Sequence, residues 1–378
     1  MRQLSYGRFL KGLFYFFLCG FLVALGSQPA IAQDNGAWKQ KWDKTLTAAK
    51  KEGKLVVFGP PGNLVRRAVT EGFHKAFPNI VIEYSAARGG AQAAKVKAER
   101  DAGIHSVDIV LQGTTTALVF FRPMKALAPI KPHLILPEVT DPKNWRDNRL
   151  EYSDKAETNL VFASNVKALV VYNLDQVKPQ EIDDLSGLLD PKWKGKVVIS
   201  NPVTPGASNV TFRFIWKALG PEKASEFYRK VRAQAAVVDR DERRMTEWVA
   251  QGRYAILVGP SDRIIADLSQ RGLKFGLIPY FTNYGSLLTP GPSSIIFVKD
   301  APHPNAASVF VNWILSKEGQ TLWSQATQYA SNRTDVPTGD LPSYVTPKSG
   351  GKYWRSYTET EVKRWPDQEK IIKELFGR

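Results

Sequence analysis

Short apolar runs with the length of β-strands alternate with amphipathic helical segments along most of this chain. In the segment 38–52, Trp38, Trp42 and Leu46 recur at helical spacing, and the apolar run 55–58 follows. The strand-like signal recurs in later runs at 80–84, 107–111, 196–199, 235–238 and 254–258. Strands that alternate with helices in this way usually form parallel sheets with helices on both faces. The pattern therefore predicts an α/β fold.

Two strand-like segments, 160–172 and 284–298, interrupt this alternation. It restarts after the first segment, and two amphipathic helices are expected after the second, at 305–315 and 319–329. We interpret the two segments as crossings between two lobes, with the second lobe inserted into the first. The length of 378 residues suits two domains. The predicted boundaries are 34–163 plus 288–378 for the first lobe and 164–287 for the second.

The first 33 residues have the three parts of a secretory signal peptide. Arg2, Arg8 and Lys11 form a positive start, 13–25 is apolar, and the small residues Ala30 and Ala32 suit signal peptidase. This apolar run is shorter than the ~20 residues that span a bilayer. We therefore expect residues 1–33 to be cleaved as a signal peptide and the protein to reach the periplasm. The single cysteine of the chain lies within this segment, so disulfides and thiolate chemistry are excluded from the exported form.

The chain is strongly basic, with a formal net charge of +16 at pH 7. Its basic doublets, Lys50-Lys51, Arg66-Arg67 and Arg243-Arg244, are scattered over separate predicted helices and have no aromatic partners of the kind that nucleic-acid sites use. We expect no nucleic-acid partner. A positive surface would still attract anionic ligands by long-range steering.

The loops at the predicted strand ends are the candidate ligand site. In open α/β sheets, ligands bind beyond the carboxyl ends of the strands, where the next helix begins. The candidate binding residues are Pro61, Asn63, Arg88, Thr114 and Thr115 in the first lobe, Asn201, Ser208, Arg240 and Ser261 in the second lobe, and Tyr280 near the return crossing. Residues of these types also cap helices, so each loop can instead be structural.

Arg88 and Arg240 are suited to an anion, because a guanidinium can bind a carboxylate or phosphonate with two parallel hydrogen bonds. Their alternatives are local: Arg240 can pair with a neighbouring aspartate, and Arg88 can be a solvated turn residue. Tyr280 can stack on a ligand or pack in the hinge.

Catalytic and metal-binding signals are weaker than these binding signals. The four histidines have no ligand spacing, and 259–262 has Asp262 where the nucleophile elbow G-x-S-x-G needs glycine. Arg88-Gly89-Gly90 is not a dinucleotide fingerprint. We therefore expect no enzymatic activity, no cofactor and no bound metal.

Four stretches carry a resemblance to a known family. They are WDKTLTAAKKEGKLVVFGPPG at 42–62, LLDPKWKGKVV at 188–198, EWVAQGRYAIL at 247–257 and APHPNAASVFVNWILSKEGQ at 301–320. In these stretches the chain resembles the periplasmic solute-binding proteins of bacterial ABC importers, in the group similar to ferric-iron-binding proteins. The resemblance implies a type II periplasmic-binding-protein-like fold, in which two mixed sheets flanked by helices form two lobes joined by two crossing strands.

The iron-binding members of this group present two adjacent tyrosines after the strand that here is 254–258. This sequence has Gly259-Pro260-Ser261 in that region and contains no Tyr-Tyr dipeptide. The resemblance therefore does not extend to the di-tyrosine iron site.

We predict a non-catalytic receptor that traps a small anionic organic solute between its lobes and delivers it to the permease of an ABC transporter. We expect a monomer that meets the membrane only through that permease. Two alternatives stay open: a receptor for ferric iron or another metal without the di-tyrosine site, and a secreted hydrolase that uses Ser261 beside Asp262.

Overall fold

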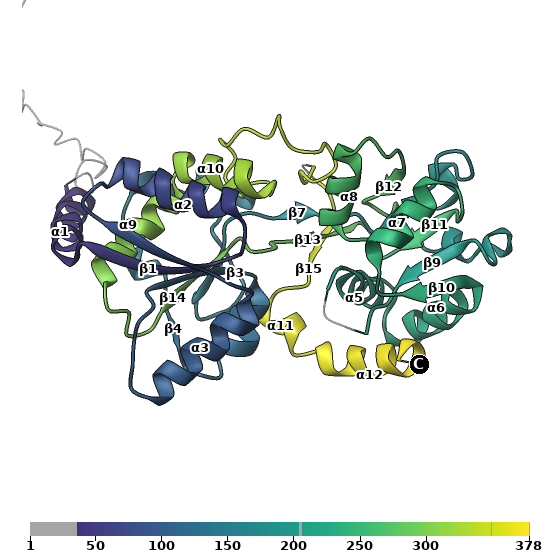
Figure 1. The fold of residues 1–378 in the computed structure, drawn as a ribbon, viewed down its shortest axis with the longest axis horizontal. Coiled ribbons are helices and arrows are strands. Elements are labelled where there is room, and N and C mark those ends of the chain that lie inside the picture. The colour runs from purple at the N-terminus through teal and green to yellow at the C-terminus, as the bar shows by residue number, and fades with distance from the viewer. Residues whose placement is uncertain (1–35, 204–205, 349, 378) are drawn as a thin grey trace, which may run out of the picture.

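The computed structural model describes residues 36–203, 206–348 and 350–377. The signal peptide predicted for residues 1–33 lies outside these ranges. The described chain forms two lobes joined by short strands (Figure 1). Within it, no helix has both the length and the apolar composition needed to cross a membrane. The expected two-lobed α/β fold with mixed sheets is confirmed.

The first lobe is built on a mixed sheet with the strand order β2-β1-β3-β14-β6-β5, and β4 also pairs with β14. Its strands are β1 (Lys54–Gly59), β2 (Val81–Ala86), β3 (Ile109–Gln112), β4 (Leu127–Ala128), β5 (Glu151–Tyr152), β6 (Asn159–Val161) and β14 (Ser294–Val298). β1 is parallel to β2 and β3, as the alternation predicts. β14 is antiparallel to β3 and β6, so the strand that returns from the second lobe enters the middle of this sheet.

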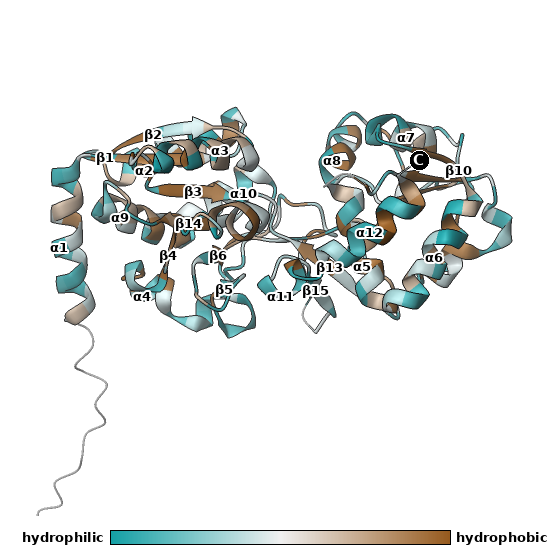
Figure 2. Cartoon of the chain, turned by 90° about the horizontal axis from the view of Figure 1, so that it is seen from below, coloured by the Kyte–Doolittle hydropathy of each residue, from teal (hydrophilic) through white to brown (hydrophobic). Residues whose placement is uncertain are grey.

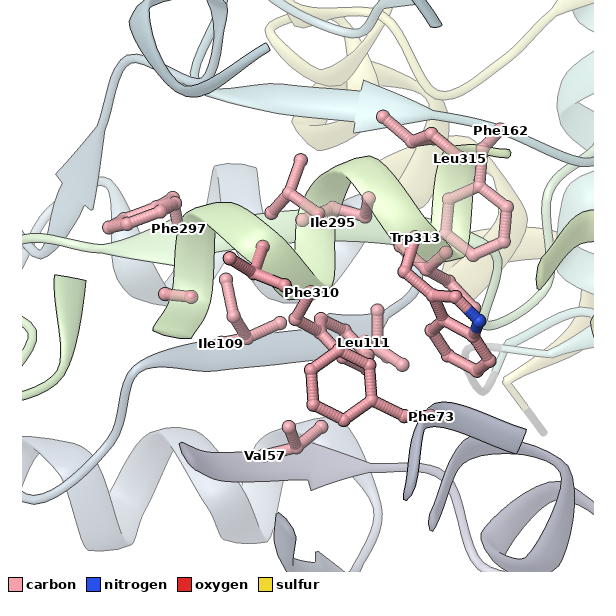
Figure 3. Close-up of a cluster of buried hydrophobic side chains, with 14 of the residues drawn as sticks. Val57, Phe73, Ile109, Leu111, Phe162, Ile295, Phe297, Phe310, Trp313 and Leu315 are labelled. Carbon is pink, nitrogen blue, oxygen red and sulfur yellow. The ribbon is translucent and has the colours of Figure 1, made fainter. Parts of the chain in front are cut away.

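Helices cover both faces of the first sheet. They are α1 (Ala37–Glu52), α2 (Asn63–Ala76), α3 (Gly89–Asp101), α4 (Pro137–Thr140), α9 (Pro304–Leu315) and α10 (Lys317–Thr327), with the π-helix η1 (Thr116–Phe121). Alternate strand residues point to opposite faces, so Val57 packs with α2 and α9, and Phe58 packs with α3. Figure 3 shows the first of these clusters, where Phe73 meets Phe310 with ring centroids 5.4 Å apart. In Figure 2 the strands β1 and β3 are brown, whereas β2 at the edge of the sheet is pale and the helices carry teal residues.

Asp108, just before β3, is a buried carboxylate that joins separate segments of the first lobe. Its Oδ2 accepts a hydrogen bond from the N–H of Val56 at 2.8 Å and lies 2.9 Å from Nδ1 of His303, and its Oδ1 accepts from the N–H of His303 at 2.7 Å.

Asp108→Asn replaces one of these acceptor oxygens with an amide group. We expect the free energy of unfolding to fall by about 1–3 kcal/mol in urea titrations. Asp43→Asn, at an exposed carboxylate of α1, should change it by less than about 1 kcal/mol, and equal effects would contradict the role of Asp108.

His133 packs flat on Phe297, with ring centroids 3.8 Å apart. Its Nδ1 lies 2.8 Å from Oγ of Ser308, which itself donates to the carbonyl of Pro304 and therefore accepts from the ring N–H. Burial, together with the nearby charge of Lys41, lowers the pKa of His133 to about 4. The folded protein thus keeps this ring neutral at pH values where an exposed histidine is charged.

The stability of the protein should decrease as the pH falls from about 6.5 to about 4. Because the unfolded chain binds a proton at this histidine with an ordinary pKa near 6.5, it takes up more protons than the folded chain in that window. We expect a loss on the order of 1–3 kcal/mol from this group, levelling off below about pH 4. Urea titrations at several pH values would measure it. His133→Gln, which does not titrate, should have a shallower pH dependence, and an unchanged slope would show that His133 is not responsible.

The second lobe has a mixed sheet with the strand order β10-β9-β11-β8-β12. Its strands are β8 (Val170–Tyr172), β9 (Val197–Ser200), β10 (Ala235–Asp239), β11 (Ile256–Val258) and β12 (Gly276–Ile278). Its helices are α5 (Ala207–Leu219), α6 (Pro221–Gln234), α7 (Glu242–Ala250) and α8 (Asp262–Gln270). β9 is parallel to β10 and β11, whereas β8 is antiparallel to β11 and β12.

Short strands between the lobes form a small sheet of their own. β7 (Asn165–Val166) pairs antiparallel with β13 (Ser286–Thr289), and β15 (Tyr353–Arg355) pairs parallel with β13 (Figure 1). β7 and β13 lie in the two segments that we predicted to cross between lobes. The C-terminal part of the chain adds the third strand to this sheet.

The C-terminus departs from the predicted lobe boundary. α11 (Glu359–Val362) contacts the first lobe, where the N–H of Glu359 donates to the carbonyl of Ser153 at 2.7 Å. α12 (Trp365–Phe376) contributes Ile372 and Phe376 to the core of the second lobe (Figure 1). Assigning all of 288–378 to the first lobe is therefore wrong for α12, because an amphipathic pattern shows that a helix packs but does not show where. We refer to residues 356–377 as the C-terminal strap.

Candidate functional site

A cavity of about 680 Å³ lies between the two lobes. Its first-lobe wall is the start of η1 and the loop 289–291, and its second-lobe wall is the starts of α5 and α8. Lys167 at the hinge and residues of the C-terminal strap complete it. The volume is in the range of sites that hold small organic ligands.

Three helices begin at this cavity. Thr114 and Thr115 precede η1, Gly206 precedes α5, and Ser261 precedes α8. The N–H groups in the first turn of a helix have no acceptor inside the helix and carry a partial positive charge. Ser261 is the N-cap residue of α8, but its side chain makes no capping hydrogen bond. The cavity wall is therefore rich in backbone donors suited to an anion.

Two loops beside the cavity approach each other closely at glycine residues. A Cβ atom on Gly113 would lie 2.8 Å from the carbonyl oxygen of Gly291. Gly291 has a φ of 51°, and a Cβ atom there would lie 2.3 Å from the ring of Tyr329. Glycine at both positions lets the two loops and this ring meet beside the cavity.

Lys167 is a buried cation in the wall, with a side chain only 2% exposed. Its Nζ donates to the carbonyl of Pro260 at 2.6 Å and to Oδ2 of Asp262 at 3.1 Å. Oδ1 of Asp262 accepts from the N–H of Ala168 at 3.0 Å. These bonds attach the start of α8 to the crossing segment that follows β7.

Arg213 of α5 is a second buried cation in the wall. Its Nη2 donates to Oε1 of Glu369 in the C-terminal strap at 2.7 Å, and its guanidinium carbon lies 3.7 Å from the ring centroid of Trp365. Burial lowers the pKa of Arg213 to about 10, partly offset by Glu369, so the group stays protonated at neutral pH. A third cation, Arg263 in the first turn of α8, is exposed and makes no salt bridge with any described residue.

The structure brings part of the predicted ligand set together. Thr114, Thr115 and Ser261 line the cavity. Ser208 is buried beside it and donates to the carbonyl of Ser200. Asn201 has internal partners, because its Oδ1 accepts from the N–H of Val203 at 2.9 Å and its Nδ2 donates to the carbonyl of Phe376 at 3.4 Å.

The other predicted residues do not line this cavity, and sheet topology explains why Arg88 and Arg240 do not. Arg88 follows β2 and Arg240 follows β10, the edge strands of the two sheets, and both side chains are exposed. Thr114 and Ser261 instead follow the central strands β3 and β11. The loops after β3 and β11 line the cavity between the lobes, whereas the loops after the edge strands β2 and β10 lie outside its wall.

The remaining predicted residues lie in loops with local partners or in solvent. Pro61 and Asn63 are exposed at the start of α2. The hydroxyl of Tyr280 accepts from the N–H of Lys352 at 3.2 Å, and its ring meets Tyr353 edge-on at 6.0 Å. Tyr280 thus packs at the hinge, which was the alternative reading of this residue.

Sequence reasoning missed Lys167, Arg213, Arg263 and the strap residues Trp365 and Glu369. Arg263 directly follows the predicted Ser261 loop, so the strand-end argument could have included it. Arg213 lies between Phe212 and Phe214 in α5, and a single arginine between core residues was the available signal.

Two tyrosines, Tyr329 and Tyr357, also line the cavity. Burial, together with nearby Asp262, raises the pKa of Tyr329, and burial, together with Glu151, raises that of Tyr357. Both phenols are therefore held in the neutral form. Within the described residues, no three His, Cys, Asp or Glu side chains gather closely enough to hold a metal ion.

Comparison with known proteins places this fold in a family. Residues 68–347 match the family model described as bacterial extracellular solute-binding protein. The match covers most of the chain, which belongs to this family of bacterial extracellular solute-binding proteins. An uncharacterized protein of Haemophilus influenzae is 23% identical over 337 residues, which is 86% of this chain and 93% of that protein.

Similar solved structures are two-lobed periplasmic binding proteins. FutA (IdiA) of Trichodesmium, in complex with iron and citrate, has a TM-score of 0.68 at 18% identity over 85% of this chain and 99% of that one. AfuA of Actinobacillus pleuropneumoniae, with fructose-6-phosphate bound, has a TM-score of 0.61 at 16% identity over 86% and 99%. Iron-bound HitA of Pseudomonas aeruginosa has a TM-score of 0.59 at 17% identity over 85% and 99%. At these identities the likeness concerns the fold.

Proposed function

We propose that this protein is the periplasmic receptor of an ABC importer, that it holds a small anionic organic solute in the cavity between its lobes, and that it delivers this solute to the permease. The observation that carries the proposal is that the starts of helices α5 and α8 meet the loop before η1 at one cavity, where Arg263 has no acidic partner among the described residues.

The charges of the wall favour an anion over a neutral solute. Lys167 is matched by Asp262 and Arg213 by Glu369, whereas Arg263 has no acidic partner among the described residues. An anionic group at the start of α8 would therefore meet both Arg263 and the first-turn N–H groups. Hydrogen bonds to charged groups of this kind contribute about 1.5–3 kcal/mol each.

The proteins of similar fold support the same chemistry. The structure of AfuA contains a sugar phosphate, and that of FutA contains citrate with iron. Both organic ligands carry the anionic groups that this cavity suits.

Binding would close the lobes by population shift. The first lobe supplies Thr114 and Thr115, and the second supplies Ser261 and Arg263. One solute can contact both sets fully only when the lobes approach, so it stabilises the closed form by its higher affinity for that form.

Replacing Arg263 tests this proposal. We expect Arg263→Ala to raise the Kd for a bound anion roughly 10-fold or more, because a charge-assisted hydrogen bond is lost. Isothermal titration calorimetry with citrate and with fructose 6-phosphate would measure it, after native mass spectrometry of protein from its own host has shown which small molecule co-purifies.

Arg240→Ala is the matched control, because it removes the same side chain from an exposed position outside the cavity. It should leave the Kd unchanged. A larger effect for Arg240→Ala than for Arg263→Ala would move the binding site to the loop after β10 and contradict the proposal.

A metal receptor is the second candidate, because Tyr329 and Tyr357 line the cavity and relatives of this fold bind iron. Their raised pKa values oppose the phenolate form that ferric iron requires. Metal analysis of the purified protein before and after treatment with a chelator distinguishes the two. Stoichiometric iron that the chelator removes would favour the metal receptor.

A hydrolase is not supported by the cavity wall. Asp262, the neighbour of Ser261, is engaged by Lys167 and by the N–H of Ala168. No histidine is among the described residues of the wall, so Ser261 has no general base within this set.

A further inference from the structure

We propose that Arg213 selects the anionic group of the solute, and that Glu369 of the C-terminal strap occupies Arg213 as an internal carboxylate until the solute displaces it. This inference rests on the proposed function, because it requires an anion in the cavity between the lobes.

The guanidinium of Arg213 makes fewer hydrogen bonds to the described residues than it has donors. Its side chain is 4% exposed, and one bond joins its Nη2 to Glu369. Its Nε is buried and has no hydrogen-bond partner among the described residues. A guanidinium has five N–H donors, and leaving a buried donor unsatisfied is unfavourable. Arg213 therefore retains capacity for a second anionic oxygen.

The surroundings fix how an anion can approach this guanidinium. The ring of Trp365 covers one face, with 3.7 Å between the guanidinium carbon and the ring centroid. A carboxylate bonds a guanidinium in the guanidinium plane, and Glu369 occupies the edge that carries Nε and Nη2 through Nη2 alone. A carboxylate or phosphate group can accept from both atoms in that geometry, whereas Glu369 uses one.

Glu369 is suited to act as a replaceable partner. Its side chain is 37% exposed, so its carboxylate can move into water, whereas Arg213 cannot leave the wall. Arg213, Trp365 and Glu369 all line the cavity, so a solute there would reach this pair directly.

The C-terminal strap connects this exchange to both lobes. Glu359 of the strap pairs with Arg122 of the first lobe at 3.0 Å, and Glu361 pairs with Lys217 of α5 at 3.5 Å. Phe376 anchors the far end of α12 in the second-lobe core. Release of Glu369 would therefore remove one attachment of the strap beside the cavity, while Trp365 and Phe376 keep α12 in place.

Calorimetric titration with citrate and with inorganic phosphate tests this inference, in the wild type and in Glu369→Gln. Without the competing carboxylate, we expect the variant to bind at least one of these anions about tenfold more tightly than the wild type. Comparing the affinity for citrate with that for phosphate shows whether the site prefers a carboxylate or a phosphate group. Glu374→Gln is the matched control, because it makes the same change at an exposed position of α12, and it should bind as the wild type does.

Arg213→Gln should lose this binding, and circular dichroism would establish that it is folded. Equal affinities of Glu369→Gln and Glu374→Gln, or no binding of either anion by Glu369→Gln, would overturn the inference. If all strap variants bind an anion with the same affinity but Arg263→Ala lowers that affinity, the proposed function stands and the role of Glu369 fails. If neither Arg263 nor Arg213 affects binding, both fail.

Discussion

Lys167→Met should destabilise the protein by about 2–4 kcal/mol, because it breaks a buried ion pair by removing one partner. Methionine keeps most of the apolar stem, so the change isolates the ammonium group. Without it, the carbonyl of Pro260 loses its donor at 2.6 Å and Asp262 loses its cation at 3.1 Å. We place the loss toward the low end of the range for buried pairs because Asp262 is partly exposed.

Urea titration followed by tryptophan fluorescence would measure this loss. Lys39→Met is the matched control, since Lys39 pairs with Asp43 at 2.7 Å on the exposed face of α1 and should contribute less than about 1 kcal/mol. The double variant Lys167→Met/Asp262→Asn should recover part of the stability, because the unpaired carboxylate is then neutral. If Lys167→Met were no more destabilising than Lys39→Met, the pair would not hold α8 to the hinge.

Phe376→Ala should also cost about 2–4 kcal/mol, because it opens a cavity in the core of the second lobe. The ring is 2% exposed and meets Phe212 edge-on, with centroids 5.1 Å apart. It also lies 6.4 Å from the ring of Tyr228. The position near the end of the chain allows some relaxation, which sets the estimate below the largest values for buried phenylalanines.

Hydrogen exchange locates this effect within the molecule. Amides of α6 in the second lobe should exchange faster in Phe376→Ala, while those of α9 in the first lobe should keep the wild-type rate. Lys373→Ala, at an exposed position of the same helix, should change neither. Equal acceleration in α6 and α9 would mean that α12 does not belong to the second-lobe core.

The local pattern was enough to locate most elements of the fold. The apolar run 55–58 becomes β1, Lys54–Gly59, and the helix expected at 305–315 becomes α9, Pro304–Leu315. These predictions succeed because burial of one strand or one helix face repeats over a few residues. The antiparallel entry of β14 between β3 and β6 was not predictable in this way, because strand order depends on pairing between distant segments.

The predictions for the candidate site succeeded and failed for the same reason. Thr114, Thr115 and Ser261 follow from the rule that ligands bind at strand ends, which needs only local sequence. The same rule also selected Arg88 and Arg240, which follow the edge strands β2 and β10 and lie outside the cavity wall. Sequence shows where a strand ends but not whether that strand is central.

By itself, the sequence determined the α/β class, the two lobes and the basic character of the molecule, because periodicity and charge are properties of the chain. The tertiary structure decided which side chains face one another. It paired Lys167 with Asp262, covered Arg213 with Trp365, and placed Glu369 beside a helix more than a hundred residues earlier. Such contacts depend on how distant segments pack together, and that packing is set by the whole core.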